Sequence, residues 1–145
     1  MWRFFGTALA LVLAFSPSAV SADDLTGSTR FLCSAVQATE CLVGGDCGID
    51  LPWNLNIPQF IEVDLEAKML STTAASGQNR TTPIEYFESE DGVICLQGYE
   101  NGRGFTFVIA EETGQLTVAI ATKGEAVIVF GACTPLATAA DSGRK

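Results

Sequence analysis

A repeating pattern of apolar stretches and tight turns runs from about residue 92 to residue 133. Each apolar stretch is followed by a turn that contains glycine, and the cycle recurs every ten or eleven residues. Asp91-Gly92 and Asn101-Gly102 are strong hairpin signals, because both residues of each pair tolerate positive φ. Short turns force neighbouring strands to run antiparallel, so the pattern predicts a β-meander. The predicted strands are 93–99, 105–110, 115–121 and 125–130.

Upstream segments add more strands, and helical periodicity is poor throughout. Candidate strands lie at 30–39, 59–65 and 83–89, and 68–73 either continues the second of these or starts a new strand after a bend. About eight antiparallel strands at this spacing predict an all-β sandwich or barrel, and the up-and-down order favours a barrel because closure removes exposed edges. We expect a long loop with room for one helical turn at 42–58, a polar loop at 76–82 and a disordered tail at 136–145.

Several predicted strands are apolar on both faces. Val127 and Val129 alternate with Ile128 and Phe130, so exposing either set to water costs free energy. Something should therefore cover the second face of the sheet. The two candidates are residues 42–58, which we favour, and a partner subunit.

Composition and charge exclude several classes of function. The chain has 145 residues, no histidine and a formal net charge of −9. Without histidine it cannot build a Ser-His-Asp or Cys-His catalytic site, a His-ligated metal site or a histidine pH switch. The negative charge argues against nucleic acid and against anionic membrane surfaces as partners.

Residues 1–22 have the three-part layout of a secretory signal peptide. Arg3 precedes an apolar run of about ten residues, and Pro17 and a set of small residues follow. The apolar run is too short for the alternative, a membrane anchor. We expect cleavage before Asp23, leaving one β domain over residues 23–135 that is periplasmic or secreted and free of the membrane after processing.

Five cysteines in an exported chain predict disulfides and at least one unpaired thiol. Many pairings are possible, and loop geometry favours Cys41 with Cys47, across a short flexible loop, and Cys33 with Cys133, on the first and last strands. Cys95 is then the spare thiol, which we expect to be buried and inert. No Cys-x-x-Cys is present, so a metal or redox site is disfavoured.

Carboxylates and aromatic side chains are the remaining candidates for a functional site. Three carboxylates alternate along one strand face, which indicates a solvated face more readily than a hydrolase: Glu62, Asp64 and Glu66. Five aromatic side chains could line a ligand pocket at a barrel mouth, with core packing as the ordinary alternative: Trp53, Tyr86, Tyr99, Phe105 and Phe107. No catalytic residue, metal ligand or cofactor is predicted.

The chain also resembles an uncharacterised family of small exported β-barrel-like proteins of Gram-negative bacteria. Three stretches carry the resemblance: Phe31-Leu-Cys-Ser-Ala with Cys41 and Cys47, Ile57-Pro-Gln-Phe60 leading into Val63-Asp-Leu, and Val129-Phe-Gly-Ala-Cys-Thr-Pro135. That family has no known activity, so the resemblance implies a fold and a compartment only. The architecture is similar to lipocalin-like carriers, although their Gly-x-Trp motif is absent, and to periplasmic protease-inhibitor barrels.

The sequence thus predicts an exported, non-enzymatic binding or interaction module whose partner is an unknown protein or an apolar small molecule. The first alternative is a small carrier that holds an apolar ligand inside a β-barrel. A hydrolase that uses paired carboxylates is the weaker alternative.

Overall fold

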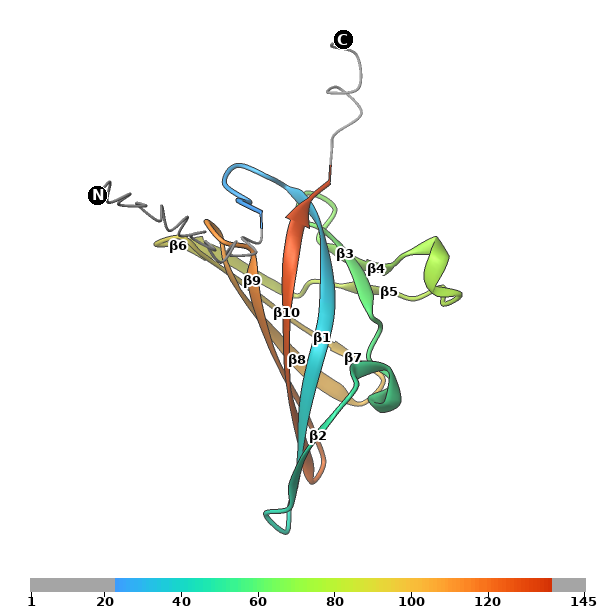
Figure 1. Ribbon diagram of the computed structural model, residues 1–145. Coiled ribbons are helices and arrows are strands. Elements are labelled where there is room, and N and C mark those ends of the chain that lie inside the picture. Colours follow the sequence, from blue (N-terminus) through green and yellow to red (C-terminus); the bar gives the residue numbers. More distant parts are fainter. Residues whose placement is uncertain (1–22, 137–145) are drawn as a thin grey trace, which may run out of the picture.

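The computed structural model describes residues 23–136 and contains one antiparallel β-sheet (Figure 1). The predicted signal peptide and residues 137–145 of the predicted tail lie outside the described residues. The strands are β1 (Arg30–Leu42), β2 (Cys47–Asp50), β3 (Phe60–Asp64), β4 (Met69–Thr72), β5 (Thr81–Pro83), β6 (Tyr86–Glu90), β7 (Val93–Glu100), β8 (Arg103–Ala110), β9 (Gln115–Thr122) and β10 (Glu125–Pro135). Two short 3-10 helices, η1 (Pro52–Leu55) and η2 (Ala74–Ser76), complete the elements.

The sheet follows an up-and-down order, β5-β4-β3-β1-β10-β9-β8-β7-β6, with β2 paired to the second half of β1. Consecutive strands are neighbours from β3 to β5 and from β6 to β10, because the turns between them are short, as the meander prediction requires. The first and last strands pair along almost their whole length, so the N- and C-terminal parts of the domain meet in the middle of the sheet. The all-β, barrel-like prediction is confirmed.

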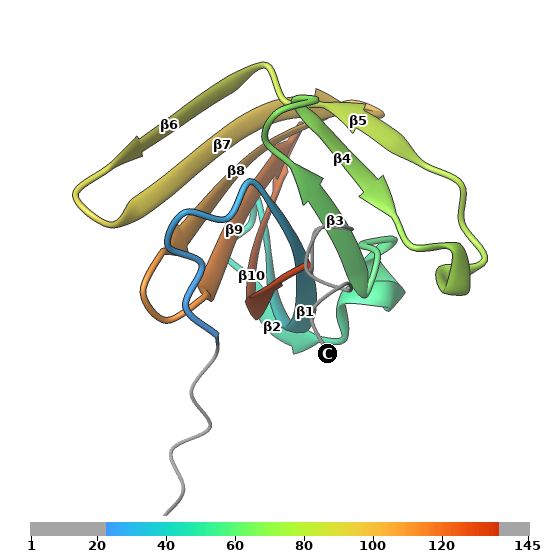
Figure 2. The same ribbon diagram turned by 90° about the horizontal axis from the view of Figure 1, so that it is seen from above.

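The two ends of this curled sheet meet at the connection between β5 and β6 (Figure 2). Ile84 N–H donates to the Lys68 carbonyl on one side, and Glu85 N–H donates to the Gln97 carbonyl on the other. Gly98 permits this approach, because a Cβ there would lie 2.9 Å from the carbonyl oxygen of Pro83. The single strand predicted at 83–89 is therefore divided, with β5 pairing to β4 and β6 pairing to β7.

A β-bulge in β1 bends the strand. The register with β10 shifts between Ala35 and Gln37, which leaves Val36 as the extra residue. Gly131 faces this bulge, and any Cβ on it would overlap the carbonyl oxygen of Ser34. A glycine is required here because the two backbones approach too closely for a side chain.

The core occupies the inside of the curl. Alternate residues of the strands point inward, as the period of two demands. One end of the interior is filled by Leu25, which is fully buried and whose N–H donates to the Glu111 carbonyl. Residues 23–29 thus belong to the folded domain and cover one end of the barrel. The buried apolar side chains are Leu25, Phe31, Cys33, Ala35, Ala38, Ile57, Val63, Leu70, Ile84, Ile94, Leu96, Phe107, Ile109, Leu116, Val118, Val127, Val129 and Cys133.

Two disulfides connect strand neighbours. Cys33 pairs with Cys133 across β1 and β10, and Cys41 pairs with Cys47 across the β1–β2 hairpin. Both pairs are those that loop geometry favoured. Cys95 is the free thiol, but it is only half-buried and lies on the outer face of β7 beside the exposed Val93, so its predicted burial is wrong.

Several predicted boundaries differ from the structure. The last strand continues past residue 130 to Pro135, because β1 supplies backbone partners as far as Phe31. The segment 42–58 contains β2 as well as the expected helical turn, since the tight turn before Cys47 returns the chain alongside β1. Residues 69–72 form a new strand, β4, after a turn.

The outer face of the sheet stays uncovered within residues 23–136. Ile128 is 37% exposed and Phe130 46% exposed. Residues 42–58 extend the sheet at the free edge of β1 through β2 and do not cover these side chains. The expectation that this segment covers the second face is wrong, because its backbone pairs with β1 edge to edge.

Candidate ligand-binding site

A pocket of about 80 Å³ opens inside the curl, at the end opposite to Leu25. Eight of the strands, the loop after η1 and the loop before β5 contribute to it, so the pocket forms only when the sheet has curled. The lining residues are Ala35, Asn56, Ile57, Pro58, Ile61, Leu70, Ser71, Thr72, Arg80, Thr82, Glu100, Arg103, Phe105, Phe107, Val118, Ile120 and Val129.

The floor of the pocket is apolar. Phe105 and Phe107 point inward from β8 and pack edge to face, with ring centroids 5.6 Å apart and an interplanar angle of 64°. Val118 and Ile120 of β9 and Val129 of β10 line the neighbouring wall. A floor of branched and aromatic side chains favours an apolar ligand group, because burying such a group removes its surface from water.

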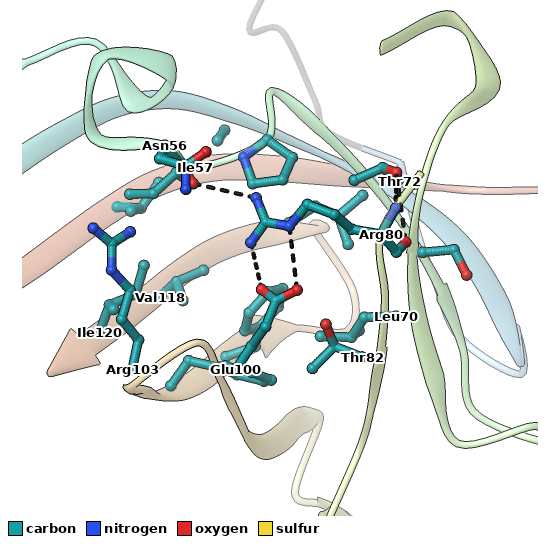
Figure 3. A pocket seen from close by; sticks show the side chains of 17 residues that line it. Asn56, Ile57, Leu70, Thr72, Arg80, Thr82, Glu100, Arg103, Val118 and Ile120 are labelled. Carbon is teal, nitrogen blue, oxygen red and sulfur yellow. Dashed lines mark hydrogen bonds and ion pairs between the residues drawn. The ribbon is translucent and has the colours of Figure 1, made fainter. Parts of the chain in front are cut away.

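The mouth of the pocket is charged (Figure 3). Arg80 donates from Nε to Glu100 Oε1 at 3.2 Å and from Nη2 to Glu100 Oε2, which makes a two-point ion pair. Both side chains are 25% exposed. The hydrogen bonds from Arg80 lower the pKa of the Glu100 carboxyl and outweigh partial burial, which raises it. Glu100 is therefore held as a carboxylate at neutral pH.

One backbone carbonyl and two side-chain oxygens hold Arg80 in place. Its Nη1 donates to the Asn56 carbonyl at 3.3 Å and to Gln78 Oε1 at 3.4 Å, while its backbone N–H donates to Thr72 Oγ1 at 3.0 Å. Asn56 ends η1 in the left-handed region with φ 55°, and this turn directs its carbonyl at the guanidinium. The loop after η1 and the loop before β5 are thereby joined at the mouth.

A second guanidinium stands on the other side of Glu100. Arg103 follows the Asn101-Gly102 turn and is paired in register with Glu100, so both side chains face inward at the end of the β7–β8 hairpin. Its Nη1 donates to the Leu55 carbonyl at 2.8 Å. Within residues 23–136 no carboxylate forms an ion pair with it.

The structure divides the aromatic candidates into two groups. Phe105 and Phe107 line the pocket. The other three lie outside it and are about half exposed: Trp53 in η1, Tyr86 on β6 and Tyr99 on β7. Tyr86 donates from its hydroxyl to Glu88 on the same strand.

The acidic row lies on the opposite surface from the pocket. Glu62 and Asp64 alternate with the inward Ile61 and Val63 of β3, and Asp64 forms an ion pair with Arg30, with Oδ2 3.2 Å from Nε. Glu66 lies in the turn after β3 rather than on the strand. Glu100 is the one carboxylate that lines the pocket, so the described residues place no second carboxylate there for paired acid–base catalysis.

Sequence reasoning missed the charged residues of the mouth. One available signal was alternation: Ile94 and Leu96 place Glu100 on the same inward face of β7. Another was the Asn-Gly turn itself, which sets residues 100 and 103 opposite each other. No local signal marks Arg80, because the β4–β5 loop meets the other residues only in the folded chain.

Residues 23–136 contain no helix that is long and apolar enough to cross a membrane. In the same range no three His, Cys, Asp or Glu side chains cluster in a way that could hold a metal ion. No known family model, curated protein or solved structure matches the chain.

Proposed function

We propose that this protein is a non-enzymatic binding protein of an exported compartment, and that it holds the apolar part of a small molecule in the pocket. The observation that carries the proposal is the combination of an apolar floor with a charged mouth in one concave site. Ligand sites in proteins have this composition, since apolar walls supply affinity and a few polar groups set orientation.

The rigidity of the site supports a binding role. Arg80 is held through both guanidinium ends and its backbone, and Glu100 is fixed by a two-point ion pair. Groups that are already ordered lose little conformational entropy when a ligand arrives. The pocket is small, about 80 Å³, against the roughly 150 Å³ of an engineered cavity that admits benzene. It therefore suits a short aliphatic group or the end of a longer one.

Export is the second part of the proposal. The leader-like layout of residues 1–22 and the two disulfides agree with an oxidising compartment, the periplasm or the exterior. We expect the N-terminus of the protein isolated from its native host to be Asp23, as determined by intact mass. Protein that retains Met1 and has reduced thiols would contradict export.

The pocket can be tested with two neighbouring substitutions on β9. Ile120 is half-buried and lines the pocket, whereas Ala119 is exposed on the outer face. Ile120→Trp should fill the pocket and Ala119→Trp should leave it open. Native mass spectrometry of protein purified from its own compartment should show a retained small molecule in the wild type and Ala119→Trp but not in Ile120→Trp. Equal retention in both variants would place the ligand elsewhere.

The open outer face favours a second candidate function, interaction with a partner protein. Val108, Ile128 and Phe130 are each more than a third exposed there. A photo-cross-linking residue at position 130 should then give a discrete protein adduct in the native compartment, and one at the exposed Glu66 should not. Absence of an adduct at position 130 would remove this candidate.

A further inference from the structure

The distribution of charge around the pocket is opposite to that of the chain. Residues 23–136 hold five basic residues, Arg30, Lys68, Arg80, Arg103 and Lys123, against sixteen acidic ones. Two of the five basic residues line the pocket, but only one of the sixteen acidic residues does. An acidic protein therefore presents a site whose own side chains sum to one positive charge.

The two arginines at the mouth have different partners. Arg80 is neutralised by Glu100 and is also bound by a carbonyl and an amide oxygen. Arg103 has one hydrogen bond, to the neutral Leu55 carbonyl, which leaves its charge and most of its N–H groups free of partners among residues 23–136. A planar guanidinium matches a carboxylate, because two parallel N–H groups can bond to both oxygens.

We propose that the ligand is a small monoanionic amphiphile, whose short apolar chain lies on Phe105 and Phe107 and whose carboxylate or similar oxyanion is bound by Arg103. This inference rests on the proposed function and adds the chemical class of the ligand. One anionic charge balances the one uncompensated guanidinium. A cationic head group would meet a site of its own sign, and a neutral head group would gain only the apolar contacts.

The test compares three probes with the same chain and different head groups: hexanoate, hexanol and hexylammonium. Isothermal titration of the full folded domain should give hexanoate an affinity about tenfold higher than that of hexanol, the size of one charge-assisted hydrogen-bonded contact. Hexylammonium should bind more weakly than hexanol. Because the comparison needs no substitution, it remains decisive if a variant does not fold.

Two variants of equal charge change locate the effect. Arg103→Gln should lower the affinity for hexanoate to that for hexanol and should leave the affinity for hexanol unchanged. Lys123→Gln, in the exposed β9–β10 turn, should keep the preference for hexanoate. Arg103→Lys should retain part of it, since the charge stays but the two-point geometry is lost.

The outcomes separate the two proposals. If hexanol binds as tightly as hexanoate and Ile120→Trp abolishes both, the pocket is a ligand site and the anion inference is overturned. If hexanoate is preferred but Arg103→Gln retains the preference, the assignment of Arg103 is overturned. If none of the probes binds at millimolar concentration, the proposed function fails together with this inference.

Discussion

The two disulfides differ strongly in the length of chain that they close, and this predicts unequal contributions to stability. Cys33 and Cys133 are separated by 100 residues, whereas Cys41 and Cys47 are separated by 6. In the chain-entropy model the first cross-link stabilises the folded state by about 4.7 kcal/mol and the second by about 2.2 kcal/mol. We expect the double variant Cys33→Ala/Cys133→Ala to lose at least twice the free energy of unfolding lost by Cys41→Ala/Cys47→Ala.

These free energies convert into melting temperatures. Residues 23–136 form the folded domain, and an unfolding entropy of about 2.1 cal/mol/K per residue makes 1 kcal/mol equivalent to about 4 °C. The melting temperature should fall by about 20 °C without the long-range disulfide and by about 9 °C without the hairpin disulfide. The loss of the Cys33–Cys133 disulfide should lower the melting temperature further, because both cysteines are buried and alanine leaves space in the core.

The melting temperatures of both variants can be measured by circular dichroism at a wavelength typical of β-strands, recorded during heating without reductant. A thiol titration should count one free cysteine in the wild type and in each double variant, which confirms that the remaining disulfide has formed. The two variants together also serve as matched controls, since each loses two sulfur atoms and one cross-link. Equal melting temperatures, or a larger loss for the hairpin pair, would refute the chain-entropy argument.

Three further predictions concern single side chains. Glu100→Gln should cost about 1–2 kcal/mol at pH 7 through loss of a charged hydrogen bond. Because the pKa of Glu100 is lowered in the folded protein, its stabilising contribution is present above the ordinary carboxyl value of 4.5 and is lost as pH falls through the folded value. Urea titrations from pH 7 to pH 3 should therefore show a smaller decrease in the free energy of unfolding for Glu100→Gln than for the exposed control Glu66→Gln. Gly131→Ala should lower the free energy of unfolding by about 3 kcal/mol or more, because its Cβ would overlap a backbone carbonyl. The control Gly104→Ala has open space around it and should cost under about 1 kcal/mol. An equal cost for the two variants would contradict the close approach at the bulge. Leu25→Ala should cost about 2–4 kcal/mol in the same urea titrations, and a neutral result would mean that residues 23–29 do not cover the end of the core.

The candidate site was only partly predictable. Alternation on β8 placed Phe105 and Phe107 on one face, but the same reasoning gave equal weight to Trp53, Tyr86 and Tyr99, which lie at the surface. Exposure of an aromatic side chain depends on which face of its strand turns inward. On β7, where both alternating sets are apolar, hydrophobicity cannot decide this, and Cys95 was placed on the wrong face for the same reason.

The strands of the meander and the Cys41–Cys47 disulfide were predictable from the sequence, because each depends on neighbours along the chain or on short turns. The Cys33–Cys133 disulfide joins residues 100 apart and forms because the folded sheet pairs β1 with β10. The meeting of the sheet ends at Ile84 and Glu85, the exposed outer face and the charged mouth were decided by the tertiary structure. Arg80 meets Glu100 only when the sheet has curled far enough to bring the β4–β5 loop over the end of β7. The curvature of the sheet depends on strand twist, on the bulge in β1 and on close backbone contact at glycines. It accumulates over all the strands, so no local segment of the sequence determines it.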